Sequence, residues 1–284
     1  MEKQKILTDV HTHTKFSPDG RATIEEMLDG ARKKGVFYYG ISEHFDYDCL
    51  VNGIHNYGSD KILLTDADGY FSRARELQKA YGKELCVLVG AEFGFTDNPK
   101  ALPIYEDFIK KYRPDFIVNS VHTEGTNDYY YGAPYFEKDG VTPKPKKEVY
   151  EYYFDLVKKS AEVEYEYDIL GHLGYCTRYA PYEDKRALIS EFSDEIDGIL
   201  KVIVARKKIL EVNSSNKAGD GFLPSAEILA RYYALGGRKI SFASDAHDVG
   251  RIAEKREEIV SVLKSIGFTY ITVPCKGEHI EVEI

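Results

Sequence analysis

Seven apolar runs with the character of strands alternate along this chain with seven amphipathic stretches of helical period. The runs predict strands at residues 5–12, 37–44, 86–93, 116–123, 167–174, 208–215 and 239–247. The stretches predict helices at 23–35, 69–82, 102–112, 147–165, 186–208, 225–237 and 253–267. Such alternation favours an α/β fold with a parallel sheet covered by helices, either an open doubly wound sheet or a closed barrel.

Every predicted strand ends in a polar side chain. These side chains are His11 and His13, His44, Glu92, His122, His172, Asn213, and Asp245 with His247. An open sheet directs residues into one crevice only from the strands beside its switch point, whereas a barrel gathers the carboxyl ends of all its strands around one mouth. We therefore expect a barrel of seven strand–helix units, followed by a hairpin at residues 268–284.

Length, composition and charge limit the classes of protein that this chain can belong to. The chain has 284 residues, of which 43% are hydrophobic, and we expect residues 1–284 to form one domain. No run reaches the roughly 18 to 20 apolar residues of a membrane helix, and no signal peptide precedes the first strand, so we expect a soluble cytoplasmic protein. The net charge of -9 gives no general attraction to nucleic acid.

The histidines are the clearest indication of chemistry. A single histidine at a strand end is usually a hydrogen-bonded, half-buried side chain, but here six of the eight histidines stand at strand ends. Imidazoles with carboxylates suit Zn, Fe or Mn, and the absence of nearby cysteine argues against a thiolate-rich structural zinc site. The set exceeds what one ion can use, so we expect two or three divalent transition-metal ions with a position open to water.

Short motifs at these strand ends resemble those of the PHP (polymerase and histidinol phosphatase) superfamily. They are H-T-H at 11–13, S-E-H at 42–44, G-A-E at 90–92, S-V-H at 120–122, G-H-L at 171–173 and S-D-A-H at 244–247. The resemblance covers essentially the whole chain. The segments YDILGHLGYCTRY, ILEVNSSNKAGDGFLPSAEILARYYALGG and SFASDAHDVGRIA are similar to the monofunctional histidinol-phosphatase branch.

This resemblance implies a distorted (β/α)7 barrel, similar to a TIM barrel, with a trinuclear metal centre. It also implies hydrolysis of L-histidinol phosphate to L-histidinol and phosphate in histidine biosynthesis. The first ion would take His11, His13, Glu92 and Asp245, the second Glu92, His122 and His172, and the third Asp19, His44 and His247. Asp19 stands where many relatives have histidine, and its harder oxygen ligand should shift the third site toward Mn or Fe and away from zinc.

The expected mechanism follows from metal chemistry. Adjacent cations lower the pKa of a bridging water toward about 7 and neutralise charge on the phosphoryl oxygens. No protein nucleophile is required, and Asp245 or His247 is the hypothetical proton relay to the leaving alkoxide. Asp9 and Glu43 flank the ligands and are expected to support them or to pack the strands rather than bind metal.

Binding of a small phosphate monoester requires further groups. Arg178 is a candidate for the phosphate, with a surface arginine as the alternative. Lys217 is a second cationic candidate, and Asn213 would orient the substrate or a loop. Insertions at 45–66 and 124–147 interrupt the alternation, and the second either forms part of the substrate pocket or is a surface excursion whose tyrosines pack on its own helix.

Two alternatives to histidinol phosphate hydrolysis stay open at this stage. The first is a PHP phosphoesterase acting on another small monoester, such as a nucleotide or phosphotyrosine. The second is a nucleic-acid-associated PHP module, which the acidic net charge and the lack of a basic–aromatic stripe disfavour.

Overall fold

The computed structural model describes residues 7–82, 84–216 and 219–284. Its main sheet has seven strands in the order β1-β2-β3-β4-β7-β8-β9, and each neighbouring pair is parallel. The strands are β1 (Leu7–Asp9), β2 (Val36–Phe45), β3 (Cys86–Gly94), β4 (Ile117–Ser120), β7 (Ile169–Leu170), β8 (Ile209–Asn213) and β9 (Ile240–Ala243).

The first and last strands meet, so the sheet curls into a nearly closed barrel. The backbone N–H of Val10 donates to the carbonyl of Phe242 at 3.2 Å. Beyond the strand ends, Asp245 N–H donates to the His11 carbonyl at 2.9 Å, and His13 N–H donates to the Ala246 carbonyl at 2.9 Å. These bonds confirm the predicted barrel of seven units and already bring two ligand-bearing segments together.

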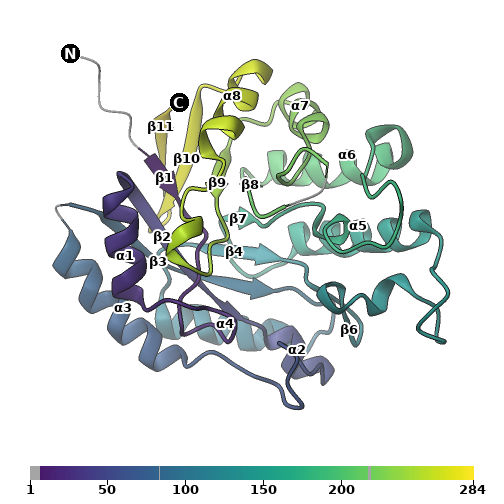
Figure 1. Cartoon of the computed structure of the whole chain (residues 1–284), viewed down its shortest axis with the longest axis horizontal. Coiled ribbons are helices and arrows are strands. Elements are labelled where there is room, and N and C mark those ends of the chain that lie inside the picture. Colours follow the sequence, from purple (N-terminus) through teal and green to yellow (C-terminus); the bar gives the residue numbers. More distant parts are fainter. Residues whose placement is uncertain (1–6, 83, 217–218) are drawn as a thin grey trace.

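Helices cover the outside of the barrel, with α1, α3 and α4 on one side of the strands and α5, α6 and α7 on the other (Figure 1). Their bounds agree with the predicted helices to within about three residues at each end. They are α1 (Ile24–Lys33), α3 (Ala67–Tyr81), α4 (Ala101–Tyr112), α5 (Lys146–Glu162), α6 (Ile189–Ala205), α7 (Ala226–Ala234) and α8 (Arg256–Ile266).

The sequence at the start of α1 explains why the helix begins there. The hydroxyl of Thr23 accepts from the N–H of Glu26 at 3.2 Å, and the Thr23 N–H donates to the Glu26 carboxylate at 2.8 Å. This reciprocal capping box satisfies two backbone donors that a helix start would otherwise leave free. The helix then buries Met27 and Leu28 against the barrel.

The predicted terminal hairpin is present as the antiparallel strands β10 (Tyr270–Cys275) and β11 (Glu278–Glu283). Its Val273 and Val282 pack in one buried cluster with residues from the barrel interior, including Phe116 and Ile209 at the amino-terminal ends of β4 and β8. The hairpin therefore closes the amino-terminal end of the barrel, and the carboxyl end is left for the polar side chains.

Close packing inside the barrel explains a glycine of β3. A Cβ atom at Gly90 would lie 2.4 Å from the ring of Phe116, so only glycine fits beside that aromatic side chain. Gly90 therefore leaves room for Phe116 inside the barrel, and Glu92, two residues later, lies on the same face of β3.

The fifth barrel strand differs from its prediction. Residues 167–174 were expected to form it, but β7 spans only Ile169–Leu170. The reason is that the N–H of His172 donates to the side chain of Glu211 at 2.8 Å and therefore leaves the ladder of backbone hydrogen bonds. The chain then turns into the short 3-10 helix η3 (Tyr175–Thr177).

Both insertions have structure of their own. The first contains the short helix α2 (Tyr47–Asn52), which the sequence pattern did not predict. The second contains the small antiparallel pair β5 (Thr123–Glu124) and β6 (Asn127–Asp128), followed by the 3-10 helices η1 (Tyr129–Tyr131) and η2 (Ala133–Tyr135). Outside the insertions, the segment after β9 forms the 3-10 helix η4 (Val249–Arg251). In the described part of the chain, no helix combines the length and apolar character that a bilayer crossing requires.

Candidate metal centre

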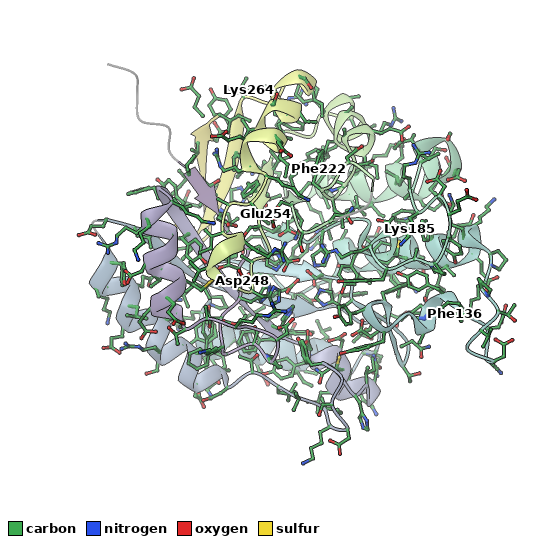
Figure 2. The ribbon with its side chains drawn as sticks, in the orientation of Figure 1. Phe136, Lys185, Phe222, Asp248, Glu254 and Lys264 are labelled. Carbon is green, nitrogen blue, oxygen red and sulfur yellow. The ribbon has the colours of Figure 1, made fainter. Side chains whose placement is uncertain are left out.

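A cavity of about 850 Å³ opens at the carboxyl ends of the barrel strands. The segment after β9 runs along one side of it, and Figure 2 labels two lining residues of this segment, Asp248 and Glu254. Seven of the nine predicted metal ligands also line the cavity: Asp19, His44, Glu92, His122, His172, Asp245 and His247. The remaining two, His11 and His13, are fully buried beneath it.

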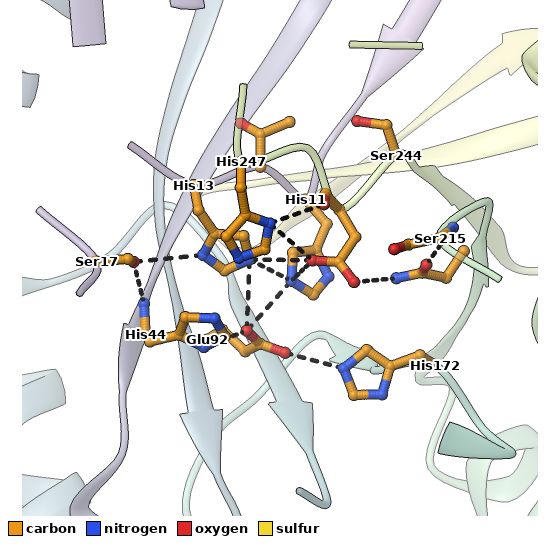
Figure 3. Close-up of polar contacts among 12 residues, drawn as sticks. His11, His13, Ser17, His44, Glu92, His172, Ser215, Ser244 and His247 are labelled. Atoms are coloured by element: carbon orange, nitrogen blue, oxygen red, sulfur yellow. Dashed lines mark hydrogen bonds and ion pairs between the residues drawn. The ribbon is translucent and has the colours of Figure 1, made fainter. Parts of the chain in front are cut away.

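Glu92 lies at the centre of the cluster, and its two carboxylate oxygens face different imidazoles (Figure 3). Its Oε2 atom lies 3.3 Å from Nε2 of His11 and 3.6 Å from Nε2 of His13. These two nitrogen atoms are 3.1 Å apart, and Oδ1 of Asp245 lies 3.4 Å from Nε2 of His13. The structure therefore brings together the four side chains expected at the first ion.

The other oxygen of Glu92 faces the second group. Its Oε1 atom lies 3.3 Å from Nε2 of His122 and 3.1 Å from Nε2 of His172, and these nitrogen atoms are 3.2 Å apart. The hydroxyl of Ser120 donates to the same oxygen at 2.7 Å and fixes its orientation. A carboxylate that offers one oxygen to each group has the geometry of a bridge between two ions.

The third group gathers around Asp19, which belongs to the turn after β1. Its Oδ2 atom lies 3.0 Å from Nε2 of His247, and its Oδ1 atom lies 3.8 Å from Nε2 of His44. The ring of His13 stacks on both imidazoles, with centroid distances of 4.1 Å to His44 and 4.3 Å to His247. Asp46 was not predicted here, yet it offers an oxygen to a further group with His44 and His122.

Buried polar atoms within the cluster fit a metal centre. Among the described residues, Glu92 Oε2, His44 Nδ1 and His247 Nε2 make no well-formed hydrogen bond and meet only other proposed ligands, at 2.8 Å between Oε2 and His44 Nδ1 and 3.0 Å between His247 Nε2 and Asp19 Oδ2; Nδ1 of His172 is buried without a partner. Buried polar atoms of this kind are rare in folded proteins unless an ion or water engages them. The donor set of imidazole nitrogens and carboxylate oxygens is the one that Zn, Fe and Mn share.

Electrostatics also favour the binding of cations at this cluster. Burial alone would raise the pKa of Glu92, but the surrounding imidazoles hold it well below its usual range. Burial opposes charge on His11 and His44, yet nearby carboxylates raise the pKa of both well above its ordinary value. Burial and the neighbouring imidazoles lower the pKa of His13 to about 3. The imidazoles cannot all carry the positive charge that the carboxylates attract, and bound metal ions would supply it.

Glu211 in β8 is a member of the site that the sequence analysis missed. Its Oε1 atom lies 2.5 Å from Nδ1 of His11, and its Oε2 atom accepts from the backbone of His172. Its side chain is fully buried. A signal was available, because Asn213 was singled out and residues two apart in a strand share a face. A carboxylate that accepts from the second nitrogen of a ligating imidazole fixes its tautomer and raises its basicity.

Asp9 and Glu43 hold the backbone that carries the ligands. Asp9 accepts from the N–H groups of Ser244 and Ala253 at 2.9 and 2.8 Å, which ties β1 to the segment after β9. Glu43 accepts from the N–H of Thr14 and the N–H of Ser17, both at 3.0 Å, and so fixes the turn before Asp19. These contacts match the supporting roles expected for both carboxylates.

Arg178 lies at the cavity and is only 11% exposed, which excludes the alternative of a surface arginine. Its guanidinium stacks over Tyr175 at 4.8 Å and lies 3.4 Å from Oδ2 of Asp245. It also donates to the amide oxygen of Asn213 at 3.3 Å. Asn213 is fully buried, a position that favours orienting neighbours over touching substrate. Lys217 lies outside the described residues, and its role stays a prediction.

Both insertions contribute to the cavity wall. The first supplies Asn56 and Tyr57, and the second supplies Asp128, Tyr130 and Tyr131. Other tyrosines of the second insertion, Tyr129 and Tyr135, are buried in the core. The insertion thus lines the cavity, as the first alternative predicted. Tyr129 also packs against Tyr153 of α5, but its complete burial contradicts a surface excursion.

Comparison with known proteins agrees with this geometry. The family model described as PHP domain matches residues 9–215, well over half of the chain. A Clostridium acetobutylicum protein named probable histidinol-phosphatase is 33% identical over 85% of this chain and 87% of its own length. A Thermotoga maritima protein of the same name is 26% identical over 95% of this chain and 97% of its own.

A solved structure has the same fold. It is the histidinol phosphate phosphatase of Lactococcus lactis, described as complexed with zinc, L-histidinol and phosphate, and it superposes with a TM-score of 0.83 at 23% identity. The match covers 98% of this chain and all of that one. The family model and the Clostridium relative establish that the chain belongs to the PHP domain family.

Proposed function

We propose that this protein is a metal-dependent histidinol-phosphatase, a phosphoric monoester hydrolase that converts L-histidinol phosphate to L-histidinol and phosphate. The observation that carries the proposal is the position of Glu92, whose two oxygens face separate groups of imidazoles inside a cavity. The name of the Clostridium relative, with which 85% of the chain aligns, supports the choice of substrate.

Two or three divalent ions of Zn, Fe or Mn would be held by the groups described above. The proposed ligands are His11, His13, Glu92 and Asp245 for one ion, Glu92, His122 and His172 for another, and Asp19, His44 and His247 for a third. Ions bound in this way lower the pKa of a coordinated water toward about 7 and neutralise charge on phosphoryl oxygens.

The residues of the chain bind and orient the phosphate ester. Arg178 reaches the cavity from the segment after β7 and would donate to phosphate oxygens that the ions leave free. Asn213 holds that guanidinium in place through its amide oxygen. Asp245 or His247, both at the cavity, would pass a proton to the leaving alkoxide.

The cysteines argue against a covalent intermediate on sulfur. Cys49 lines the cavity, but burial raises its thiol pKa far above the ordinary value, which disfavours the nucleophilic thiolate. Cys176 is buried as well, and burial also raises its pKa. Direct attack by water on phosphorus is therefore the proposed reaction.

One experiment tests the proposal. The protein is purified without added metal, its metal content is measured, and phosphate release is followed from L-histidinol phosphate, a nucleoside monophosphate and phosphotyrosine. We expect at least one tightly bound equivalent of metal and the highest kcat/KM for L-histidinol phosphate. Full activity with less than one equivalent would refute the metal mechanism, and a preference for either other ester would replace the proposed substrate.

A further inference from the structure

Aromatic rings form a wall that leads from the metal ligands to the rim of the cavity. This tyrosine wall consists of Tyr175, Tyr179 and Tyr130. The ring centroid of Tyr175 lies 4.9 Å from that of His172 and 5.8 Å from that of Tyr179, and Tyr179 lies 4.8 Å from Tyr130. Tyr130 and Tyr179 are 55% and 36% exposed, so their faces are available to a ligand in the cavity.

Asp128 lies next to Tyr130 in the lining of the cavity. It pairs with Thr123 across the β5–β6 ladder, and Thr123 directly follows the predicted ligand His122. Its Oδ1 atom accepts from the N–H of Tyr130 at 2.7 Å. The backbone pairing thus fixes a carboxylate of the cavity next to the segment that carries His122 and next to Tyr130.

Asp128 is half-buried at the cavity and forms no ion pair with another described side chain. Four other carboxylates line the cavity outside the proposed metal groups. Asp48 is fully buried and accepts from the hydroxyl of Thr123 at 2.8 Å, Asp46 accepts from the hydroxyl of Tyr57, Asp248 accepts from the N–H of Gly250 at 2.9 Å, and Glu254 pairs with Arg251 at 3.0 Å. Asp128 is the carboxylate that adjoins the tyrosine wall, which places it to take a cationic group of a ligand bound there.

The proposed substrate carries such a group at a fixed place. In L-histidinol phosphate the ammonium is attached to the carbon next to the ester methylene, so it stays close to the phosphorus atom. The imidazole lies one methylene farther out. A site for this molecule must offer an anionic group beside the metal cluster and a flat apolar surface farther from it. Asp128 provides the anionic group, and the tyrosine wall provides the apolar surface.

We propose that Asp128 binds the substrate ammonium and that Tyr130 and Tyr179 hold the imidazole ring. The pocket then selects phosphate esters that carry an ammonium next to the ester methylene. The ammonium makes a charge-assisted hydrogen bond, and the imidazole stacks on or meets the edge of a tyrosine ring. This inference rests on the proposed function and deepens it from a reaction to a basis for specificity.

The variant that tests this subsite is Asp128→Asn. Asparagine keeps an oxygen that accepts from the Tyr130 N–H and removes only the charge. Glu124→Gln is the matched control, because Glu124 lies on the same small hairpin and accepts from the Tyr129 hydroxyl at 2.7 Å but does not line the cavity. Metal content and thermal unfolding of both variants should match the wild type.

The substrates are L-histidinol phosphate and its analogue without the amine, 3-(imidazol-4-yl)propyl phosphate. Asp128→Asn should lower kcat/KM for L-histidinol phosphate by about ten- to a hundredfold, mainly through KM, and change the analogue by less than about twofold. Tyr130→Ala should instead weaken both imidazole-bearing esters alike and leave phosphoethanolamine unchanged. Glu124→Gln should change none of these values.

The outcomes separate this inference from the proposed function. An equal loss on both imidazole esters in Asp128→Asn, or no loss on either, overturns the ammonium subsite. A wild-type enzyme that hydrolyses other esters but not L-histidinol phosphate refutes the proposed function. In that case the ammonium subsite is tested separately by comparing kcat/KM of the wild type for phosphoethanolamine and for ethyl phosphate, which lacks the ammonium. A ratio below about two overturns the subsite.

Discussion

Nδ1 of His11 lies 2.5 Å from Oε1 of Glu211, and both side chains are fully buried. The two residues come from strands that β9 separates at the barrel mouth, one following β1 and the other in β8. The same carboxylate accepts from the N–H of His172 and from the amide of Asn213 at 3.0 Å. Glu211 therefore orients the side chain of His11 and fixes the backbone that carries His172, so it supports two of the proposed metal groups.

We predict that Glu211→Gln weakens metal binding by about ten- to a hundredfold, the usual cost of losing a group that orients a ligating histidine. The amide keeps the shape of the side chain but withdraws the negative charge that makes His11 a stronger donor. Metal retained after dialysis against a graded series of chelator concentrations measures the effect. Asp115→Asn is the control, because Asp115 is a buried carboxylate at the other end of the barrel, where it accepts from the Val89 N–H.

The control should lose stability, by about 1 to 3 kcal/mol, with no change in metal affinity. Equal metal loss in Glu211→Gln and Asp115→Asn would mean that general destabilisation, and not the orientation of His11, weakens the centre.

Glu92→Ala should remove more than one equivalent of metal and nearly abolish turnover. The reason is that Glu92 is the one residue proposed to bind two ions, and its loss leaves two cations close together without the negative charge between them. Elemental analysis beside phosphate release measures both effects. A variant with full metal content and a near-normal rate would contradict the bridging role.

Removal of metal should lower the melting temperature by about 5 °C or more. An ion held at a free concentration of 100 times its dissociation constant adds about 2.7 kcal/mol to the free energy of unfolding, and each kcal/mol moves the melting temperature of a protein of this size by about 2 °C. Without ions, the buried carboxylates Glu92 and Asp245 keep only imidazoles and Arg178 to balance their charge. Scanning calorimetry with and without chelator checks this, and identical transitions would argue against bound ions in the folded state.

The strand ends explain how much of this site the sequence could predict. A parallel barrel places the carboxyl ends of its strands around one mouth, so His11, His44 and Glu92 could be assigned to one site from their positions alone. The same logic predicted the seven units and their helices, because hydrophobic periodicity repeats within each unit.

Contacts across the barrel mouth could not be predicted in this way. Glu211 lies inside a strand, and its partner His11 is distant in sequence, so only the folded structure shows that they meet. Likewise, the pairing of Asp128 with Thr123 depends on a two-residue ladder too short to show a hydrophobic period. The length of β7 was overestimated for a related reason, since a side chain, Glu211, takes the N–H of His172 out of the ladder.

The last prediction concerns Arg178, which lies at the cavity with its guanidinium between Tyr175 and Asp245. Arg178→Ala should lower kcat/KM for L-histidinol phosphate by about ten- to a hundredfold, since a lost charge-assisted contact to phosphate typically costs about 1.5 to 3 kcal/mol. Arg178→Lys should recover only part of this loss, because an ammonium cannot reproduce the bidentate geometry of a guanidinium. Metal content should stay the same in both variants, since Arg178 donates to Asn213 and faces only the outer oxygen of Asp245, not the oxygen near His13. Steady-state kinetics beside elemental analysis decide the matter: an alanine variant within about twofold of the wild type would assign phosphate binding to Lys217 or to the metals alone.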